Sequence, residues 1–299
     1  MDASPPDVVV IGDLVTDVSV QTSSAAPAPG SDTAATILVG DGGSGGNTAA
    51  WLHEAGVRAG LVTRVGDDVH GRALVDRLRR SGVQVAAATD VRVHTGAVVA
   101  MIAGDAERTM LADRGACAML AASDLPVGWF RAGAHLHVSG YALFDLPGRH
   151  GGMAAVRRAV AVGMSVSIDP ASWAPLRRVG AQRFRALAAG ARLWLPNLDE
   201  ARVLTGTGDP SVAARALATG GAEVVVTCGA AGAVWSDGTA VRRVGAPAGA
   251  VVDTTGAGDA FAAGYLAARL GGEEAVEALD RGVALAARAV GRVGARPRG

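Results

Sequence analysis

Apolar and polar positions along this chain form blocks that predict strands and helices in turn. The first apolar run, Val8–Gly12, predicts a short strand. From residue 134 onward the pattern is regular, with short apolar runs separated by segments of helical period. This alternation is typical of a parallel sheet that is covered by helices on both faces. The predicted strands are His135–Ser139, Met164–Ile168, Leu193–Pro196 and Glu223–Thr227, and the predicted helices span 150–162, 180–190, 199–204 and 211–219.

Two segments of the N-terminal half interrupt this alternation. Ser19 to Thr36 is polar and rich in Pro, Ala and Ser, which predicts a loop or an excursion from the main fold. Thr95–Ala103 and Glu107–Leu111 flank a turn, and this hairpin-like piece suggests a small second sheet. Between the two segments, the pattern predicts a helix at Asn47–Gly56, a strand at Arg58–Val65 and a helix at Gly71–Ser81.

The composition allows a large core and favours no special partner. The 299 residues, 49% of them hydrophobic, predict roughly two domains or one large α/β domain. The 28 basic and 28 acidic residues balance, so nothing favours nucleic acid, a membrane or acidic partners. No apolar run reaches the roughly 20 residues of a membrane span, and the polar start before Val8 is unlike a signal peptide. Cys117 and Cys228 cannot form a disulfide framework, so we expect a cytoplasmic protein.

All 28 basic residues are arginine, because the chain contains no lysine. Walker P-loop enzymes, protein kinases and Schiff-base enzymes each need a lysine for their chemistry, so the sequence excludes these three classes. The chain keeps two asparagines, Asn47 and Asn197, and both lie in candidate motifs.

Residues 251–265 carry the most informative pattern of the chain. A short apolar run leads into Asp253-Thr254-Thr255, then Gly256-Ala257-Gly258-Asp259, and then small residues at helical spacing through Leu270. Glycines before a helix let backbone N–H groups converge on an anion, and the helix dipole adds positive potential there. Asp259 beside such an anion hole suits a base that takes a proton from a hydroxyl as it attacks a phosphate. The alternative is that Asp259 only caps the helix after a glycine turn.

A second glycine-rich segment follows a short apolar run and opens a helix. Gly40, Gly42 and Gly45 satisfy the dinucleotide pattern G-x-G-x-x-G, but the ribose-binding acid that should follow is not clear. We expect instead that the backbone here approaches a small polyhydroxylated ligand, with Asn47 as a donor and an acceptor. A flexible glycine turn is the other interpretation.

Polar side chains follow two of the predicted strands. Asp13 and Asp17 come at the end of the first strand, where open α/β sheets bind ligands, and could accept hydrogen bonds from vicinal hydroxyls of a sugar. Solvated turn residues are the alternative.

Asn197 and Glu200 share one face at the start of a helix. A carboxylate near a phosphate site usually acts through Mg²⁺ or its waters. The spacing Asn-x-x-Glu is also commonly a capping box at the start of a helix. The two roles are compatible.

A third candidate segment follows the strand at Glu223–Thr227. The Thr227 hydroxyl and the open backbone at Gly229 and Gly232 suit the phosphates of a nucleotide. A plain hairpin turn is the alternative. Cys228 reads as a small buried neighbour rather than a nucleophile, because no histidine partner is suggested.

Together these motifs resemble the ribokinase/PfkB family of carbohydrate kinases, in the family's order and over nearly the whole chain. The resemblance implies a three-layer α/β/α core with a mostly parallel central sheet, plus a small β-sheet lid. It assigns residues 1–12, 40–91 and 114–299 to the core and residues 13–39 and 92–113 to the lid. The matching segments are Gly12-Asp13 with Asp17, Gly42-Gly43 through Asn47, Asp169-Pro170, Asn197 to Glu200, Thr227 to Gly232 and Asp253 through Asp259.

The resemblance also implies an activity and a set of roles. The γ-phosphate of ATP would pass to a hydroxyl of a sugar or sugar derivative, with Mg²⁺ and K⁺ as the cations. Asp259 would be the base, Gly256, Ala257 and Gly258 would form the anion hole, and Glu200 would act on Mg²⁺ through water. The acceptor would contact Asp13, Asp17, Gly42, Gly43 and Asn47, the nucleotide would contact Asn197, Glu200, Thr227, Gly229 and Gly232, and K⁺ would lie beside Asp253 and Thr255 and near Arg292–Gly294.

The chain departs from ribokinase itself at two places. Ser44 stands where ribokinase has a lysine, and no glutamate follows the strand at His135–Ser139, so ribose is not the expected acceptor. We expect a carbohydrate kinase, with a nucleoside kinase of the same fold as the alternative and a non-catalytic ligand sensor as a more distant one. A homodimer through the lid is a further expectation, and no nucleic acid or membrane partner is expected.

The acceptor is expected to be a neutral sugar. The carboxylates of Asp13 and Asp17 accept hydrogen bonds from hydroxyls and repel anions. Arg108, on the presumed lid, could contact an acid or phosphate group when the lid closes, or could be a solvated hairpin residue paired with Glu107 or Asp105. Few aromatic residues lie in the lid to stack on a nucleobase. Neutral sugars therefore rank first, nucleosides second, and sugar acids or phosphates third.

Overall fold

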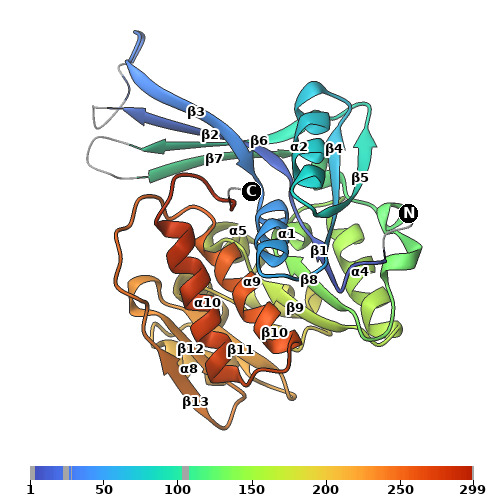
Figure 1. Ribbon diagram of the computed structural model, residues 1–299, viewed down its shortest axis with the longest axis vertical. Helices are drawn as coiled ribbons and strands as arrows, with labels where there is room; N and C mark the ends of the chain where they lie inside the picture. Colours follow the sequence, from blue (N-terminus) through green and yellow to red (C-terminus); the bar gives the residue numbers. More distant parts are fainter. Residues whose placement is uncertain (1–3, 23–26, 28, 103–107, 298–299) are drawn as a thin grey trace.

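A large sheet forms the centre of the protein (Figure 1). The structure, a computed structural model, describes residues 4–22, 27, 29–102 and 108–297. In the described part, this sheet has 9 strands in the order β13-β12-β11-β10-β9-β8-β1-β4-β5. Neighbours from β5 to β11 pair in parallel, and β12 and β13 add an antiparallel edge. The strands are β1 (Val8–Ile11), β4 (Ala59–Gly66), β5 (Gln84–Asp90), β8 (His135–Ser139), β9 (Ser165–Asp169), β10 (Leu193–Trp194), β11 (Glu223–Thr227), β12 (Ala233–Ser236) and β13 (Val241–Val244).

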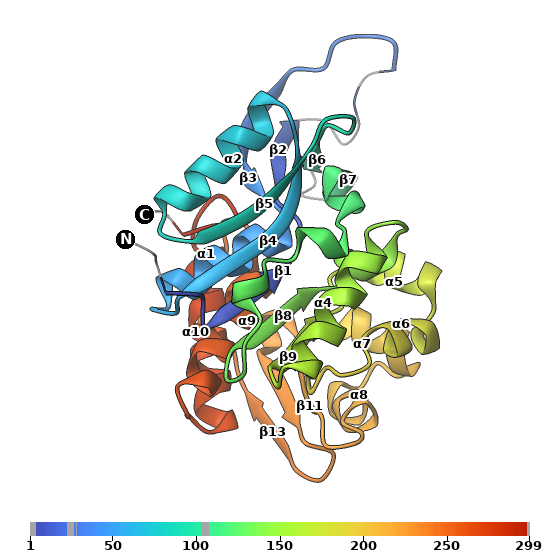
Figure 2. The ribbon, with the colours of Figure 1, turned by 90° about the vertical axis from the view of Figure 1, so that its right-hand side faces the viewer.

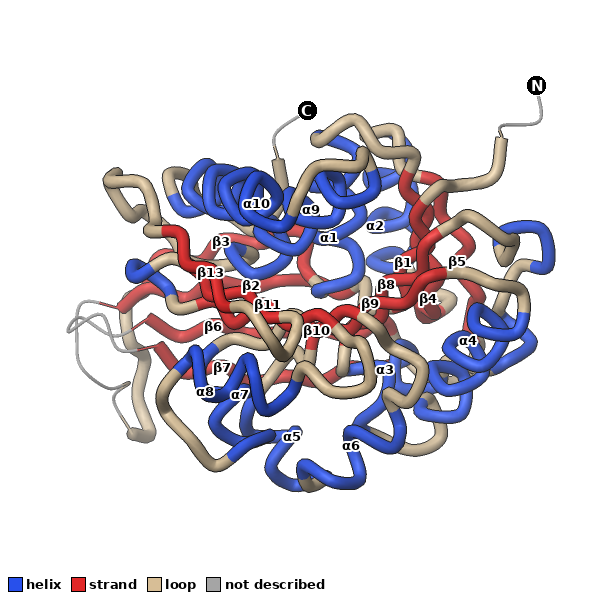
Figure 3. The backbone as a smooth tube through the Cα atoms, turned by 90° about the horizontal axis from the view of Figure 1, so that it is seen from below, coloured by secondary structure: helices blue, strands red, loops and turns tan. Residues whose placement is uncertain are grey.

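Helices cover both faces of this sheet, which gives three layers (Figure 3). One layer holds α1 (Ser44–Glu54), α2 (Val69–Arg80), α9 (Ala257–Leu270) and α10 (Ala275–Val290), and the other holds α3 (Tyr141–Phe144), α4 (Arg149–Ala161), α5 (Trp173–Val179), α6 (Ala181–Leu187), α7 (Leu198–Thr205) and α8 (Pro210–Leu217). Short 3₁₀ turns lie at Ala116–Met119, Ala122–Asp124, Val127–Trp129 and Gly229–Ala231. No helix in the described ranges combines the length and apolar character needed to cross a membrane.

Strand β1 shows how the sequence produces the layers. Its four residues are all fully buried. Side chains alternate between the faces of a strand, so Val8 and Val10 enter the core under α1 and α9, while Val9 and Ile11 enter the opposite core. A strand that is apolar on both faces is stable only between two helical layers. The parallel sheet predicted from the apolar runs is therefore observed.

A smaller, separate sheet of four strands extends from one side of the main body (Figures 1 and 2). Its order is β3-β2-β6-β7, in which β2 and β6 are parallel and the other neighbours antiparallel. Its strands are β2 (Val15–Thr22), β3 (Ala35–Gly42), β6 (Thr95–Ile102) and β7 (Arg108–Gly115).

Two expectations about the N-terminal half need correction. Asp17 does not follow the first strand in a turn but lies inside β2, and the segment predicted as a loop contributes Ser19–Thr22 to that strand. Polar residues form a strand here because β3 and β6 satisfy the backbone groups of β2 from both sides. The helix predicted from Asn47 begins at Ser44, so two of the glycines lie inside α1. The lid boundaries at 13–39 and 92–113 remain a proposal, and the strands of the small sheet continue past them to Gly42 and Gly115.

Candidate active site

A cavity of about 1130 Å³ lies at the carboxyl ends of the parallel strands, next to the small sheet. Open α/β sheets bind ligands at this edge. The cavity brings together residues that are distant in the sequence. Of the predicted site residues it is lined by Asp13, Asp17, Gly42, Gly43, Asn47, Asn197, Glu200, Thr227, Thr255, Gly256, Ala257, Gly258 and Asp259.

Asp259, in the first turn of α9, accepts three hydrogen bonds from the start of α1. Ser44 Oγ and Thr48 Oγ1 donate to its Oδ1 over 2.9 and 3.2 Å, and Asn47 Nδ2 donates to its Oδ2 over 3.0 Å. Burial raises the pKa of Asp259, and these donors oppose that rise because they favour the charged carboxylate. The carboxylate is therefore held in one orientation on the cavity wall. Asn47 was predicted from the sequence, whereas Thr48 and the contact from Ser44 were not, because no local pattern indicates them.

The two glycines before Asp259 have different requirements. Gly256 has a φ of 75°, and a Cβ there would lie 2.5 Å from the carbonyl oxygen of Ala295, so only glycine fits. A Cβ on Gly258 would meet no atom within 4 Å. The N–H of Ala257 makes a long bond of 3.3 Å to the carbonyl of Thr254. The start of α9 therefore presents backbone N–H groups and open space to the cavity.

The glycine-rich segment packs tightly under the acceptor side of the cavity. A Cβ on Gly43, whose φ is 92°, would lie 2.3 Å from the carbonyl oxygen of Asp13. A Cβ on Gly45 would lie 2.6 Å from the carbonyl carbon of Gly12. A Cβ on Gly42 would lie 2.9 Å from Cβ of Asp17. These glycines let α1 begin directly against the end of β1, so they form a close contact rather than a flexible turn.

Asp13 forms a buried ion pair that was not predicted from the sequence. Arg114, in β7, donates from Nε to Asp13 Oδ2 over 2.7 Å and from Nη2 to Oδ1 over 2.8 Å. Both side chains are about nine-tenths buried, at 12% and 8% exposure. The guanidinium also lies 3.5 Å from Asp145 and stacks over the ring of Tyr141. Asp13 thus enters the cavity with its charge balanced, and the pair joins β7 of the small sheet to the end of β1 in the large sheet.

Asn197 and Glu200 form a capping box at the start of α7. Glu200 accepts from the Asn197 N–H over 2.9 Å and from Nδ2 over 2.6 Å, and its own N–H donates to Asn197 Oδ1 over 2.9 Å. Burial and the nearby carboxyl of Asp169 raise the pKa of Glu200 well above its ordinary value. Burial and the charge of Asp259 raise the pKa of Asp169. Burial and mutual repulsion disfavour the charged forms of these two carboxyls. A cation in the cavity would stabilise their charged forms.

The predicted nucleotide segment divides into two parts. Thr227, at the end of β11, lines the cavity. Gly229 and Gly232 do not line it. A Cβ on Gly232 would lie 1.9 Å from the carbonyl oxygen of Val244, so this glycine is needed for the approach of β13. The nucleotide contacts of these two glycines remain a prediction.

Asp253 and Thr255 lie in a loop that is tied to the end of α10. Asp253 Oδ1 accepts from the N–H and the hydroxyl of Thr255, and Oδ2 accepts from the N–H of Gly294 over 3.0 Å. The carbonyl of Val290 accepts from the N–H of Val252 over 2.8 Å and from that of Asp253 over 3.2 Å. The structure therefore brings together the segments predicted to border a cation site.

Arg108 begins β7, and its side chain lies outside the described residues.

Comparison with known proteins agrees with this geometry. The family model described as pfkB family carbohydrate kinase matches residues 5–298. A 2-dehydro-3-deoxygluconokinase of Bacillus subtilis (strain 168) is 29% identical over 268 residues, which cover 84% of this chain and 81% of the relative.

Solved structures share the architecture over almost the full length. The adenosine kinase from Sinorhizobium meliloti has a TM-score of 0.87 at 26% identity and covers 98% of this chain and 96% of its own. A double mutant of the fructokinase from Vibrio cholerae O395, with fructose, ADP and a potassium ion bound, has a TM-score of 0.79 at 26% identity and covers 98% and 95%. The predicted fold class, a mostly parallel α/β core with a small separate sheet, is confirmed.

Proposed function

Since the chain belongs to the pfkB family of carbohydrate kinases, we propose that it transfers the γ-phosphate of ATP to a hydroxyl of a sugar or sugar derivative. The observation that carries this proposal is the carboxylate of Asp259, held by three donors beside an open helix N-terminus. A protein that only binds its ligand gains nothing from a carboxylate next to a phosphate. The non-catalytic sensor is therefore the weaker alternative.

The proposed mechanism assigns two tasks to the first turn of α9. Asp259 accepts the proton of the acceptor hydroxyl as the oxygen attacks the γ-phosphorus, and the bond to the β-phosphate oxygen breaks. The N–H groups at Ala257 and Gly258, with the dipole of α9, stabilise negative charge on the transferred group. Proton acceptor and anion hole lie in one helical turn, so a single rigid element aligns both.

The acidic residues opposite α9 fit a magnesium nucleotide. Glu200 and Asp169 line the cavity, and both carry a cost of burial that a divalent cation would offset. Glu200, already bonded by Asn197, would hold Mg²⁺ through its waters, and the ion would neutralise phosphate charge. Thr227 would contact the nucleotide phosphates from the end of β11.

The screen that tests the proposed function measures ADP release from ATP across sugars, sugar acids and nucleosides. We expect turnover with a neutral sugar, because the charge of Arg114 is balanced by Asp13 and the carboxyls of Asp17 and Asp145 also line the cavity. No ADP release with any alcohol would contradict a kinase, and a preference for nucleosides would select the alternative acceptor class. A strong preference for an anionic sugar that Arg108→Ala removes selectively would overturn the ranking.

Replacing Arg114 with lysine is expected to raise the KM of the acceptor by about 10- to 100-fold, with a smaller effect on kcat. A lysine ammonium cannot reproduce the two-point pairing that orients both oxygens of Asp13, and a charge-assisted hydrogen bond is worth roughly 1.5–3 kcal/mol. The measurement is steady-state kinetics with the best acceptor of the screen. Arg72→Lys, in an exposed pair with Asp67, is the control. Equal acceptor KM values in both variants would mean that Asp13 does not contact the acceptor.

Potassium is expected to stimulate the enzyme several-fold, with little effect of sodium. The loop at Asp253 and Thr255 is bonded to Gly294 and leads directly into the anion hole. A monovalent cation bound there by backbone carbonyls would add positive charge near the transferred phosphate. The measurement compares rates in K⁺, Na⁺ and a bulky organic cation at matched ionic strength. Equal rates in K⁺ and in the organic cation would refute the site.

Two further expectations stay proposals. Ile37, Leu38 and Val39 in β3 are each more than half exposed on an edge of the small sheet, which supports a homodimer through the lid. Cys117 and Cys228 are both free thiols in the structure, and the cytoplasmic location expected from them stays a prediction.

A further inference from the structure

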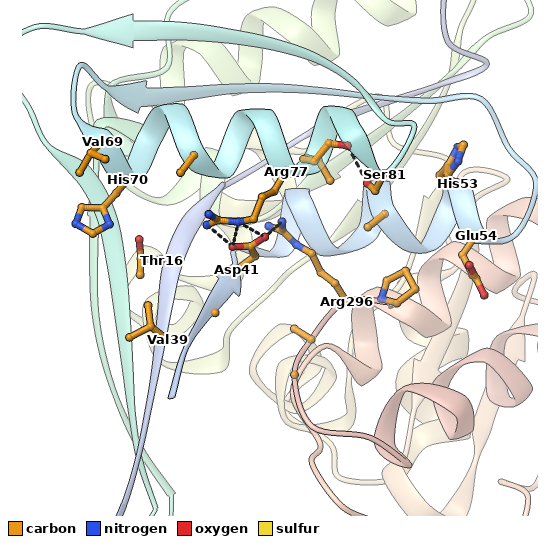
Figure 4. Close-up of a pocket in the computed structure, with 17 residues that line it drawn as sticks. Thr16, Val39, Asp41, His53, Glu54, Val69, His70, Arg77, Ser81 and Arg296 are labelled. Atoms are coloured by element: carbon orange, nitrogen blue, oxygen red, sulfur yellow. Dashed lines mark hydrogen bonds and ion pairs between the residues drawn. The ribbon is translucent and has the colours of Figure 1, made fainter. Parts of the chain in front are cut away.

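One arginine from the C-terminal segment reaches the back of the glycine-rich segment. Arg296 donates from Nη2 to the carbonyl of Gly42 over 2.7 Å and from Nε to Asn47 Oδ1 over 3.1 Å. Its Nη1 lies 3.5 Å from Asp41, and its side chain is 11% exposed. Figure 4 shows Arg296 extending from the C-terminal segment toward Asp41 and Arg77. The guanidinium is thus one residue away from Asp259, with only Asn47 between them.

The two ends of the Asn47 amide face different partners. Nδ2 donates to the Asp259 carboxylate, which in its charged form can only accept. Oδ1 accepts from the Arg296 guanidinium, which can only donate. A flipped amide would place its oxygen against the carboxylate and its NH₂ against the guanidinium, and both contacts would be repulsive. Arg296 and Asp259 therefore together fix the orientation of the Asn47 amide, with Arg296 holding its oxygen end.

The chain makes room for this arginine and anchors it. A Cβ on Gly46, inside α1, would lie 2.4 Å from Arg296 Nη2. Glycine in a helix costs roughly 0.5–1 kcal/mol relative to alanine, and here its missing side chain is the space that the guanidinium occupies. One helical turn after Asn47, Trp51 Nε1 donates to the carbonyl of Ala295 over 2.9 Å. The C-terminal segment is therefore bonded to α1 at two successive residues, Ala295 and Arg296.

We propose that Arg296 is a positioning residue that acts through Asn47 to hold Asp259 in its reactive orientation. The inference rests on the proposed function of Asp259 as the base. Arg296 does not line the cavity of the candidate active site. Contacts with Asp41, the Gly42 carbonyl and Asn47 offset the desolvation cost of the buried guanidinium. One of these three contacts orients the Asn47 amide.

The charge of Arg296 also acts on the base. Burial lowers the pKa of Arg296 to about 10, so the group stays protonated at neutral pH. Asp259 faces this cation and the carboxyl of Asp169, with Ser44, Asn47 and Thr48 as neutral donors. Removing the cation leaves the negative neighbour, so the pKa of Asp259 should rise. The acid limb of the kcat/KM profile should then move to higher pH.

The first test removes the guanidinium and then supplies it from solution. Arg296→Ala is expected to lower kcat by about 10²-fold, the scale of a misplaced catalytic group, while the KM of ATP stays nearly unchanged. Arg296 lines a cavity of about 710 Å³ on the far side of the glycine-rich segment (Figure 4). Added guanidinium ion should therefore restore activity in a dose-dependent manner, whereas sodium at equal ionic strength should not. Arg77→Ala is the matched control, because Arg77 pairs with the same Asp41 but does not contact Asn47.

Two further variants keep the test decisive if Arg296→Ala does not fold. Gly46→Ala displaces the guanidinium without removing it and should show the same loss of kcat. Arg296→Lys keeps the charge but loses the forked contact, and should fall between wild type and alanine. Combining either variant with Asn47→Ala should cost no more than Asn47→Ala alone, because both changes act on one path.

The outcomes separate this inference from the proposed function. Full turnover in Asp259→Asn would overturn the base itself. An inactive Asp259→Asn together with a fully active Arg296→Ala and an unmoved acid limb would overturn only the role of Arg296. Additive losses in the double variants, or equal losses in Arg77→Ala and Arg296→Ala with no rescue, would assign Arg296 to stability alone.

Discussion

Asp259→Asn is expected to lower kcat by about 10²–10⁴-fold, while ATP and the acceptor still bind. Asparagine keeps the shape of the side chain but cannot take the proton of the attacking hydroxyl. The site tolerates the change because Ser44 and Thr48 donate through hydroxyls, which can turn and accept from the new NH₂ group, while the remaining oxygen still faces Asn47. The loss should therefore be one of chemistry and not of folding.

Kinetics, ligand binding and thermal unfolding of Asp259→Asn test this expectation together. Asp199→Asn, at an exposed carboxylate in α7, is the control. In the wild type, kcat/KM should fall on the acid side as Asp259 becomes protonated, with a midpoint above the ordinary 3.8 because burial raises this pKa. A near wild-type kcat in Asp259→Asn would refute the mechanism.

Gly258→Val should be at least as damaging to turnover, although it should hardly change the stability of the fold. A side chain at 258 meets no atom within 4 Å and would extend into the open space that the phosphate needs. Loss of one donor of an oxyanion-type site costs roughly 3–4 kcal/mol, or about 10²–10³-fold in kcat. The expected result is a folded protein with almost no ADP release.

Two other glycines give the controls for this variant. Gly128→Val also meets no atom within 4 Å but does not line the cavity, so it should keep full activity. Gly256→Val should instead lower the melting temperature, because the φ of 75° and the Ala295 carbonyl leave no room for a side chain. If Gly258→Val retains ATP turnover, the phosphate does not lie at the start of α9.

Most of the large sheet could be predicted from the sequence because its strands are apolar on both faces. The run at Glu223–Thr227 became β11 without a change in its bounds, and the helix ending at Leu270 became α9. The small sheet was only partly predicted, since β2 alternates polar and apolar residues and pairs with β6, far along the chain, as well as with β3. The separate helix α10 was not predicted from the sequence, although its apolar face packs on α9.

The candidate site was predicted less completely than the fold. Motif order indicated Asp259, Asn47 and the glycines around them, because each motif is a local device with its own chemistry. The pairing of Asp13 with Arg114 was missed, since 101 residues separate them. Arg296 and Thr48 were missed for the same reason.

The sequence alone determined the fold class, the family resemblance and the residue types available for chemistry, because apolar periodicity and short motifs are properties of neighbouring residues. The tertiary structure decided which of these residues meet. Ser44, Asn47 and Thr48 are more than 200 residues before Asp259, and only the packing of α1 on α9 turns them toward its carboxylate. Arg296 reaches Asn47 across 249 residues. Such contacts depend on the path of the whole chain, since a hydrogen bond acts over about 3 Å in space and leaves no pattern in the sequence between its two ends.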